Sequence, residues 1–443
     1  RKAIISMFFP FLLAAAVVQI NQFVDTYWVA GLGNIASSAI ATITPIYGLM
    51  MCAGLGVGVG ATTTISFRLG RGDFEAANRL ASQAITIGII CAIISSILIL
   101  LLINPTIDFM GAQDVRDECL EYMFPFIIFS PVVLIELIIG AILRSEGAAR
   151  KSMIVQVSAA GFNILIDPIL IYGLGMGVMG AGLATCISAL LATMIGLHWY
   201  LKGSMKLKLR IRDLRPDKEY MKEVMEVGGP RTGQALISNL TDVIQRVFLI
   251  IAGGTNAVMF YNFAWRYIGL VQLPANAFDT AMVPVCSAAN GSDDAAKMRA
   301  GISYAFNMIL LCSIFFMIFM IVLADPLMSI MTQEPSMHEL HGTFVWTLKV
   351  SALLLPFIAM MGIGSSILQS LKRSQISMRY YMLWAIVKLG LYAVACMYSF
   401  EAIIYSMVLV HTFGGISLMI LANKEFKKRF PGEKMLNLRP AKR

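Results

Sequence analysis

Five polar side chains inside strongly apolar segments form the pattern that could do chemistry. Asn21 precedes Asp25 by four residues and Asn163 precedes Asp167 by four, so each pair occupies one face of a helix. Together with Thr185, they would lie roughly 8–10 Å below one membrane surface, at a rise of about 1.5 Å per residue. Their oxygen atoms suit a hard cation such as Na⁺. Two carboxyl groups at low dielectric could instead hold a proton near neutral pH.

Polar residues at membrane depth have a simpler explanation, because membrane helices often hydrogen-bond to one another through such side chains. That explanation is favoured for Asn21 or Thr185 taken alone. For Asp25 and Asp167 a functional role is favoured, because an ionisable group inside a membrane is expensive on insertion scales. Pro168, directly after Asp167, also weakens the helix ladder and can free a backbone carbonyl as a further ligand. The sequence therefore predicts a cation-coupling site at these positions.

The composition indicates a protein that lies mostly in lipid. Of its 443 residues, 58% are apolar and only 14% are charged, whereas soluble domains carry about 25% charged residues. Apolar runs of about 20 residues or more predict twelve membrane-spanning helices, and hence an all-α membrane protein. The predicted spans are 3–30, 39–66, 76–103, 118–143, 151–172, 178–201, 222–251, 257–288, 297–324, 343–370, 376–399 and 401–423.

The charges of the predicted loops indicate an orientation. Alternate loops hold a single basic residue, Arg116, whereas the others hold clusters of Lys and Arg, with the longest loop at 202–222. By the positive-inside rule the basic loops are cytoplasmic, so both termini should lie on the cytoplasmic side of the plasma (inner) membrane. The net charge of +9 sits in these loops and in the C-terminal tail. It therefore indicates contact with anionic lipid headgroups rather than with nucleic acid.

The two halves of the sequence resemble each other at a shift of about 220–225 residues. Pro131 maps to Pro356, and the segment 142–145 maps to 367–370. Each half has an even number of predicted helices, so both enter the membrane in the same sense, as in a parallel repeat. We expect two pseudo-symmetric six-helix bundles. The predicted domains are an N-terminal, cation-coupling bundle (1–201), a basic cytoplasmic linker (202–221), a C-terminal bundle (222–423) and a basic cytoplasmic tail (424–443).

The second half carries basic groups where the first half is acidic. At positions that match the first-half site it has Asp242, Arg246 and Lys388, and His411 lies in the same half. We expect Asp242 to pair with Lys388 or with Arg246, which would leave the N-terminal bundle as the ion-coupling half. Direct binding of an anionic substrate by Lys388 is the competing interpretation.

Several segments resemble the multidrug and toxic compound extrusion (MATE) family of transporters. The segment FVDTYWVAGLG at 23–33 resembles the end of the family's helix 1, NILIDP at 163–168 resembles helix 5, and GAGLAT at 180–185 resembles the start of helix 6. The loops LGRGD at 69–73 and LRSEG at 143–147 are also similar. The resemblance covers nearly the whole chain and looks closer to the DinF-like branch or to archaeal members.

The resemblance implies two six-helix bundles in a V shape and efflux of drugs or organic cations driven by Na⁺ or H⁺. The family's N-terminal cation site matches Asp25, Asn163, Asp167 and Thr185, where Na⁺ could bind. Asn21 stands where some relatives carry Tyr. Some branches place an essential acid in helix 10, and this sequence has none between residues 353 and 370. That departure argues against coupling through the C-terminal bundle.

The predicted function is secondary active efflux of amphipathic, cationic small molecules by antiport with Na⁺ or H⁺. Alternating access between the two bundles would move the compound, and ion entry at Asp25 and Asp167 would bend or shift the first helix near Pro10. We expect a monomer in the lipid bilayer that needs no cofactor. The sequence contains no HExxH, GxSxG, DDxxD or P-loop motif, so we expect neither an enzyme nor direct use of ATP. The alternative is a flippase for a lipid-linked intermediate. The basic residues Lys388, Arg246 and Arg266 are the features that favour it.

Overall fold

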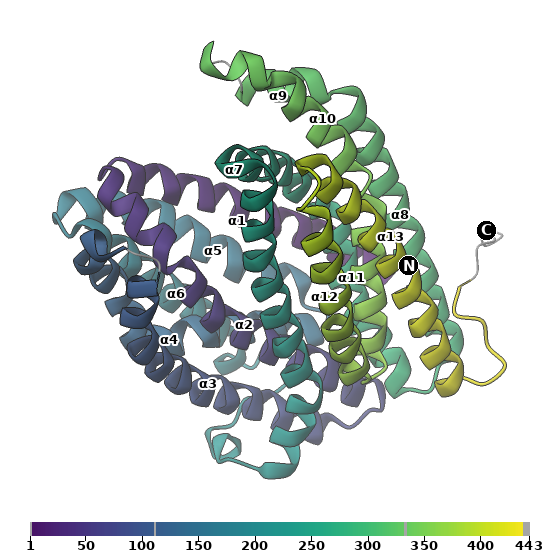
Figure 1. The fold of residues 1–443 in the computed structure, drawn as a ribbon. Helices are drawn as coiled ribbons and strands as arrows, with labels where there is room; N and C mark the ends of the chain where they lie inside the picture. Colours follow the sequence, from purple (N-terminus) through teal and green to yellow (C-terminus); the bar gives the residue numbers. More distant parts are fainter. Residues whose placement is uncertain (1, 110–111, 332–334, 437–443) are drawn as a thin grey trace. The chain divides into compact units, whose positions relative to one another are not determined.

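The computed structural model describes residues 2–109, 112–331 and 335–436, and nearly all of them lie in helices (Figure 1). By their contacts the helices form two compact units. We call Phe9–Thr232 the first bundle, and Arg1–Phe8 together with Gly233–Arg443 the second bundle. The division crosses the first helix between Phe8 and Phe9, next to Pro10.

Small residues and buried hydroxyl groups hold the first bundle together. Its described long helices are α1 (Lys2–Ala30), α2 (Asn34–Gly70), α3 (Phe74–Phe109), α4 (Arg116–Ser145), α5 (Ala149–Pro168) and α6 (Gly177–Leu201). Helix α4 packs against α2, α3 and α6, and α5 packs against α6. At Gly182 in α6, an added Cβ atom would stand 2.5 Å from the carbonyl oxygen of Tyr122 in α4, so the approach requires glycine. The hydroxyl of Ser66 in α2 donates to the carbonyl of Ser145 at 3.0 Å.

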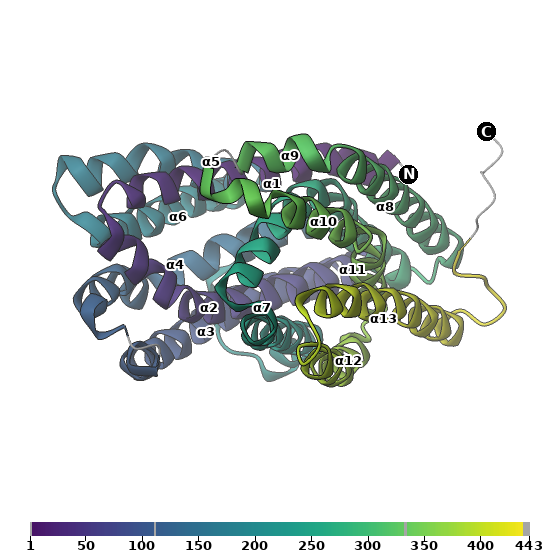
Figure 2. The same ribbon diagram turned by 45° about the horizontal axis from the view of Figure 1, so that its top comes forward.

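The second bundle repeats this arrangement, but its spans are divided differently among the helices. Its described α-helices are α7 (Lys218–Gly291, whose start belongs to the first bundle), α8 (Ala295–Val322), α9 (Ala324–Met331), α10 (His341–Ala352), α11 (Leu355–Ser370), α12 (Ser374–Ala395) and α13 (Phe400–Arg429). Helix α11 packs against α8 and α13, and α12 lies beside α13 (Figure 2). The carbonyl of Ser370, the repeat counterpart of Ser145, accepts a hydrogen bond from the Asn290 amide at 3.0 Å.

The breaks in the second bundle have local causes. Gly254 has φ +67° and ψ −161°, a backbone conformation that favours glycine, and it divides α7 into two spans. Leu353 and Leu354 separate α10 from α11, and Pro356 follows in the first turn of α11. A proline is tolerated there because the first N–H groups of a helix have no partner within the helix. Helices α10 and α11 therefore form one interrupted span.

Short helical turns occupy four of the connections. They are η1 (Gln113–Val115), the π-helical turn η2 (Ile169–Gly173), η3 (Ile211–Leu214) and η4 (Pro335–Leu340). Together with α9, η4 occupies the segment that the sequence left as a loop at 325–342, of which residues 332–334 lie outside the described chain. The π-helical turn follows Pro168, whose missing N–H interrupts the regular hydrogen-bond ladder at the end of α5.

The predicted fold class is confirmed: the protein is an all-α membrane protein with twelve spans in two six-helix bundles. Among the described residues, ten helices are long and apolar enough to cross a membrane by hydropathy alone. The two remaining spans are α12 and the second part of α7. Helix α12 falls short because it carries Arg379 and Lys388 among its apolar residues. Both were nevertheless predicted from the sequence as the apolar runs at 257–288 and 376–399.

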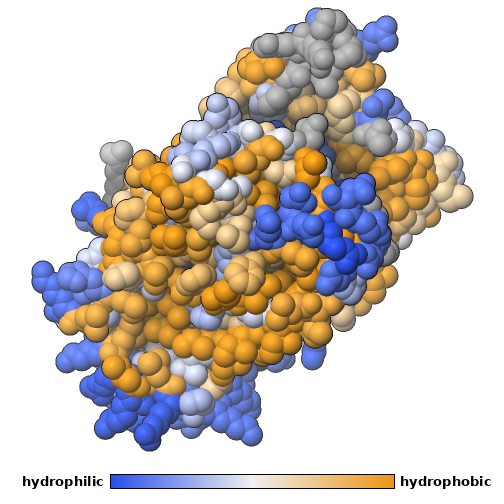
Figure 3. Space-filling model, turned by 90° about the vertical axis from the view of Figure 1, so that its left-hand side faces the viewer, coloured by the Kyte–Doolittle hydropathy of each residue, from blue (hydrophilic) through white to orange (hydrophobic). Residues whose placement is uncertain are grey.

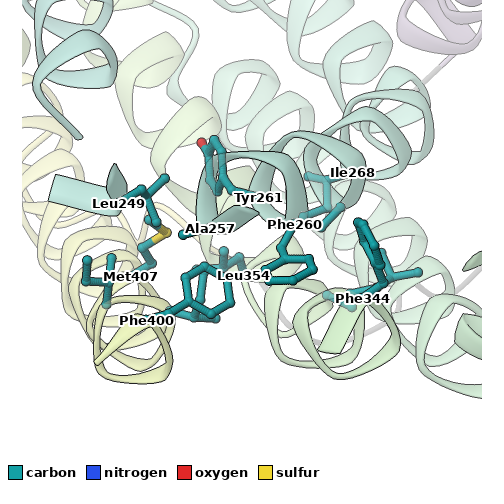
Figure 4. Packing of buried hydrophobic residues seen from close by; sticks show 14 of the residues in the cluster. Leu249, Ala257, Phe260, Tyr261, Ile268, Phe344, Leu354, Phe400 and Met407 are labelled. Atoms are coloured by element: carbon teal, nitrogen blue, oxygen red, sulfur yellow. The ribbon is translucent and has the colours of Figure 1, made fainter. Parts of the chain in front are cut away.

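The apolar side chains divide between buried cores and the outer surface. Figure 3 shows a face dominated by apolar side chains, with hydrophilic ones at its lower edge and in a patch at the right of the view. On α3, for example, Ile93, Ile97 and Leu101 are exposed, as expected for side chains that face lipid. In the core of the second bundle, Phe260 packs edge-on against Phe344 with 4.7 Å between ring centroids (Figure 4). Apolar residues on both sides of a helix are typical of a membrane span.

The segment between the bundles is docked on the first bundle. The side-chain amide of Gln83 in α3 donates to the carbonyl oxygens of Asp213 and Arg215, each at 2.7 Å, and its oxygen accepts from the Asp217 N–H. The hydroxyl of Thr86, one turn along α3, donates to the carbonyl of Leu214 at 2.8 Å. These bonds satisfy the irregular backbone of the linker around η3.

Helix α13 extends into the predicted tail. It continues to Arg429, past the predicted end at residue 423. Arg429 forms an ion pair with Asp293 in the turn between α7 and α8, and Arg299 in α8 pairs with Glu433 at 2.7 Å. The start of the tail is therefore attached to the second bundle.

Candidate functional site

Four of the five predicted site residues meet in the first bundle. Helix α1 contributes Asp25, α5 contributes Asn163 and Asp167, and α6 contributes Thr185. The amide of Asn163 donates to Asp167 Oδ1 at 3.1 Å and lies 3.5 Å from Thr185 Oγ1. The carboxyl groups of Asp25 and Asp167 lie within hydrogen-bonding reach of each other. Asp167 is completely buried, whereas Asp25 and Thr185 are half-buried.

Among the described residues, the partners of the Asp25 and Asp167 carboxyl groups, apart from each other, are neutral. The second carboxylate oxygen of Asp167 is buried and accepts no hydrogen bond from any described residue. The ion pairs found among the described residues include neither Asp25 nor Asp167. Two negative charges in contact at low dielectric repel each other by several kcal/mol. A contact between these two groups is therefore unfavourable when both are ionised and nothing compensates their charge.

Local structure fixes the helix ends beside this pair. The hydroxyl of Tyr172 in η2 donates to the carbonyl of Trp28 near the end of α1, at 2.5 Å. Helix α1 is thereby tied to the segment that follows Asp167. The π-helical turn after Pro168 places Tyr172 in this position. The unusual turn thus contributes to bringing Asp25 and Asp167 together.

Asn21 remains apart from the hydrogen-bonded set. It is half-buried on α1, its side-chain oxygen has no hydrogen-bond partner among the described residues, and no described bond joins it to Asp25. It lies one helical turn from Asp25, as its spacing predicts. In the structure it adds an unsatisfied acceptor near the pair rather than a direct contact.

Two tyrosines near the carboxyl pair were not identified from the sequence. Tyr47 of α2 and Tyr122 of α4 lie close enough to Asp25 to interact with its charge, and Tyr122 also interacts with Asp167. Their rings pack around Phe126, with centroids 5.0 and 5.4 Å from its ring. The sequence places Tyr122 near the same end of its span as the carboxyl pair. That signal does not distinguish it from the many other aromatic residues at similar depth.

The second bundle has an ion pair at the matching positions. Lys388 Nζ of α12 lies 3.6 Å from Asp242 Oδ1 of α7, so of the two pairings considered for Asp242 the structure has the one with Lys388. Arg246 is exposed and takes part in no ion pair within the described chain. His411 Nδ1 lies 2.8 Å from the carbonyl oxygen of Met407. Since a carbonyl only accepts, Nδ1 carries the hydrogen and Nε2 is left for other partners.

A cavity of about 290 Å³ lies within the second bundle, beside this ion pair. Its size is near the lower end for small-molecule sites. Helices α7, α8, α11, α12 and α13 line it. Its charged and titratable side chains are those of Asp242, Asp279, Lys388 and His411. Its aromatic side chains are those of Tyr261, Trp265, Tyr381 and Trp384.

These features define a class of protein. Two six-helix bundles built from a parallel repeat, with ionisable side chains inside apolar helices, form a membrane transporter. The MatE family model matches residues 10–169 and 230–412, which is more than half of the chain. The chain therefore belongs to the MatE family, as the sequence motifs predict, and it is a transporter rather than an enzyme.

Relatives and solved structures agree with this assignment. The chain is 24% identical over 426 residues to the multidrug export protein MepA of Staphylococcus aureus strain MRSA252, covering 95% of this chain and 93% of MepA. It is 25% identical over 419 residues to MepA of Staphylococcus saprophyticus, covering 93% and 91% of the two chains.

Among solved structures, the fold matches a MOP superfamily transporter from Pyrococcus furiosus, described as having a binding pocket of reverse polarity. The TM-score is 0.91 and the identity 24%, with 97% of this chain and 96% of that chain covered. A crystal structure of a MATE protein in complex with MaL6 matches with the same TM-score, identity and coverage. At this identity the structural likeness shows a shared fold.

Proposed function

We propose that this protein is a secondary antiporter that exports amphipathic organic cations in exchange for Na⁺ or H⁺. Its staphylococcal relatives are named multidrug export proteins, which supports an export function with a broad substrate range. The coupling ion binds at Asp25 and Asp167 in the first bundle. Asn163 and Thr185 supply the neutral groups around it. The protein works as a monomer and alternates access between its two bundles.

One observation carries this proposal: two carboxyl groups contact each other among neutral partners. With both groups ionised and no cation present, the pair is unstable. A bound ion or proton removes the repulsion and stabilises the closed contact between α1 and α5. Release of the ion allows the carboxyl groups to separate. The site therefore links ion occupancy to the position of α1.

Helix α1 is the element that would transmit this change. Pro10 lies inside α1, next to the point where the helix passes from the second bundle to the first. A proline in a helix interior removes one backbone hydrogen bond and makes bending easier there. Ion binding at Asp25 would therefore move or bend α1 about Pro10.

The basic loops give the proposed orientation of the protein in the membrane. We place the linker, the tail and both termini on the cytoplasmic side of the plasma membrane, because the Lys and Arg clusters lie in these segments. The carboxyl pair then lies near the external side. The ion enters from outside, and the exported compound binds from the cytoplasm.

The proposal is tested by transport from proteoliposomes under a Na⁺ gradient and, separately, under a pH gradient. Ethidium serves as the amphipathic cation. Asp25→Asn and Asp167→Asn should each lower gradient-driven transport by about 100-fold, near the upper end of usual coupling energies. Asp117→Asn is the matched control, because Asp117 is exposed at the start of α4.

The outcomes separate the possible drivers. Dependence on only one gradient identifies the coupling ion. Transport of wild-type size in Asp25→Asn and Asp167→Asn would contradict the proposed site. Movement of a labelled lipid-linked sugar without any ion gradient would instead support the flippase.

A further inference from the structure

The ion pair in the second bundle is loosely held. Lys388 Nζ and Asp242 Oδ1 are 3.6 Å apart, which is longer than a charge-assisted hydrogen bond of about 2.7–2.9 Å. The Asp242 side chain is 58% exposed, whereas that of Lys388 is 14% exposed. Asp242 therefore presents accessible carboxylate surface to the cavity. A second positive group could approach it without unfolding the helices around it.

The Lys388 ammonium also has a second favourable contact. It lies 5.7 Å from the centre of the Tyr392 ring, one turn further along α12, within the range of a cation–π interaction. The Tyr392 hydroxyl is buried and has no hydrogen-bond partner among residues 2–109, 112–331 and 335–436. A lysine has a long, flexible side chain with three donors. Lys388 can therefore leave Asp242 and remain solvated by the Tyr392 side chain.

Aromatic side chains surround the carboxylate surface of the cavity. Tyr261 and Trp265 of α7 stack with centroids 5.0 Å apart, and Trp384 of α12 stacks on Tyr380 at 5.7 Å. Ring faces are negative and attract cations, most strongly those of tryptophan. The charged groups lining the cavity are two carboxylates and one ammonium, with His411 beside them. Both features favour a positive ligand over a negative one.

We propose that this cavity binds an aromatic organic cation, and that the Lys388 ammonium competes with this cation for the carboxylate of Asp242. In the empty cavity the Lys388 ammonium neutralises Asp242. A bound compound places its own cationic group beside Asp242 and its ring among Tyr261, Trp265 and Trp384, while Lys388 turns to Tyr392. This inference rests on the proposed export function and names a substrate site within the second bundle. Lys388 then weakens binding and so helps release the compound.

The competing role for Lys388 is that of a receptor for an anionic group. In that role the ammonium would attract a carboxylate or sulfonate, and its removal would abolish binding. The two carboxylates that line the same cavity would repel such a ligand. The two roles predict opposite effects for the same substitution.

Two probes with one benzyl group and opposite charges separate these roles. Benzyltrimethylammonium is the cation and phenylmethanesulfonate is the anion. Binding of each to the full-length, detergent-purified protein is measured by isothermal titration calorimetry without any ion gradient. If the ammonium probe does not bind, the cavity proposal is overturned, and the coupling site is not affected by that result. The coupling site is tested separately, by the gradient dependence of transport in Asp167→Asn.

We expect wild-type protein to bind the cation more tightly than the anion. Lys388→Met should tighten cation binding by about tenfold or more, since the ligand no longer has to displace an ammonium from Asp242. Lys388→Arg keeps the competitor and should bind as wild type. Asp242→Asn should weaken cation binding, and adding Lys388→Met to it should restore nothing. Lys349→Met is the matched control, because Lys349 is exposed on α10 and does not line the cavity.

Three results would overturn the inference. The first is a Lys388→Met protein, with a thermal unfolding midpoint like that of Lys388→Arg, that binds the cation no better than wild type. The second is tighter binding of the sulfonate than of the ammonium by the wild-type protein. The third is unchanged cation binding in Asp242→Asn.

Discussion

The two bundles place different charges at matching positions of one repeat. In the first bundle, Asn163 stands beside the carboxyl pair of Asp25 and Asp167 and contributes a neutral amide. In the second bundle, Lys388 takes the position of Asn163 and contributes an ammonium to Asp242. In the proposed function the first site takes a cation or a proton from outside the protein, whereas the second site carries its own cationic group.

This difference indicates how one repeat can serve two tasks. A carboxyl pair without a basic partner responds to the ion concentration around the protein, because its stability depends on a bound ion. A carboxylate with a tethered ammonium is satisfied at any ion concentration. We therefore propose that only the first bundle couples to an ion gradient, while the second bundle is free to bind a ligand.

The largest effect is expected when the first bundle receives an ammonium at the position that Lys388 occupies in the second bundle. Asn163→Lys places an ammonium next to Asp167, where it should permanently take the place of the bound cation. We expect gradient-driven ethidium transport to fall by about 100-fold, as for the loss of a full coupling energy. The thermal unfolding midpoint should also lose its dependence on the coupling ion, because the ion no longer binds the folded state.

The control for this substitution is Asn163→Met, which has a similar length and no charge. Asn163 is 4% exposed, so both variants must fit a longer side chain into the same space. If the charge matters, the methionine variant keeps some ion-dependent unfolding and the lysine variant keeps none. Equal ion dependence in wild type and Asn163→Lys would refute the role of the pair as an ion site.

A second prediction concerns the helix contacts that support each site. Gly182→Ala in α6 would place a methyl group 2.5 Å from the Tyr122 carbonyl, and Gly415→Ala in α13 would place one 2.7 Å from the Phe357 carbonyl of α11. Backbone atoms cannot move aside easily, so each change should destabilise the protein by about 2–3 kcal/mol. Thermal unfolding measures this effect.

The two glycine variants should differ in whether unfolding still depends on the coupling ion. Gly182→Ala disturbs α4 beside Tyr122 and should weaken the ion dependence of unfolding. Gly415→Ala lies in the second bundle and should leave that dependence intact. Gly161→Ala in α5 is the control: no atom lies within 4 Å of the added Cβ, and alanine favours a helix by about 1 kcal/mol over glycine. A loss of stability in Gly161→Ala as large as in Gly182→Ala would contradict this explanation.

Most of the fold was predictable because membrane spans are long and each span has a counterpart in the other half of the repeat. The apolar runs at 257–288 and 376–399 predicted the second part of α7 and α12, and these spans are the counterparts of α2 and α5 in the repeat. The break between α10 and α11 and the short helix α9 were not predicted. Both depend on local backbone geometry near Pro356 and after α8, which apolar periodicity does not describe.

The candidate site was predictable only as far as depth and helix face allow. Counting residues from the helix ends placed Asp25, Asn163, Asp167 and Thr185 at one level, and the structure brings these four together. Asn21 has the right depth but no described bond to the pair. Its rotation about α1 relative to α5 depends on helix packing, which the sequence does not specify. The aromatic cavity of the second bundle was missed for the same reason.

The smallest predicted effect concerns how each bundle holds the chain segment that leaves it. In the first bundle, Glu146 at the turn after α4 accepts hydrogen bonds from the Tyr200 hydroxyl at 2.7 Å and from the N–H groups of Lys206 and Leu207 at 2.8 and 3.1 Å. In the second bundle, the tail is held by the pair of Arg299 and Glu433, whose side chains are 34% and 40% exposed. The first contact is partly buried and the second is screened by solvent.

Burial raises the pKa of Glu146 above its ordinary value of 4.5, although the hydrogen bonds from Tyr200 and the linker backbone oppose the shift. An acid with a raised pKa binds its proton more tightly in the folded protein. The favourable contribution of Glu146 is therefore complete below its unfolded pKa and is lost as the pH rises through its folded pKa. Glu146→Gln stays neutral, and its amide oxygen can still accept from the two N–H groups while its NH₂ faces the Tyr200 hydroxyl.

We therefore expect Glu146→Gln to gain stability relative to wild type as the pH rises through that window, by on the order of 1 kcal/mol or less. Thermal unfolding midpoints measured from acid to neutral pH check this, with the exposed Glu121→Gln as control. Glu433→Gln should have a smaller effect that disappears in high salt, because its ion pair is exposed. A steady loss of stability in Glu146→Gln at neutral pH would show that the charge itself, rather than the acceptor, anchors the linker. The two bundles would then hold their outgoing segments by the same kind of interaction, contrary to the comparison drawn between them.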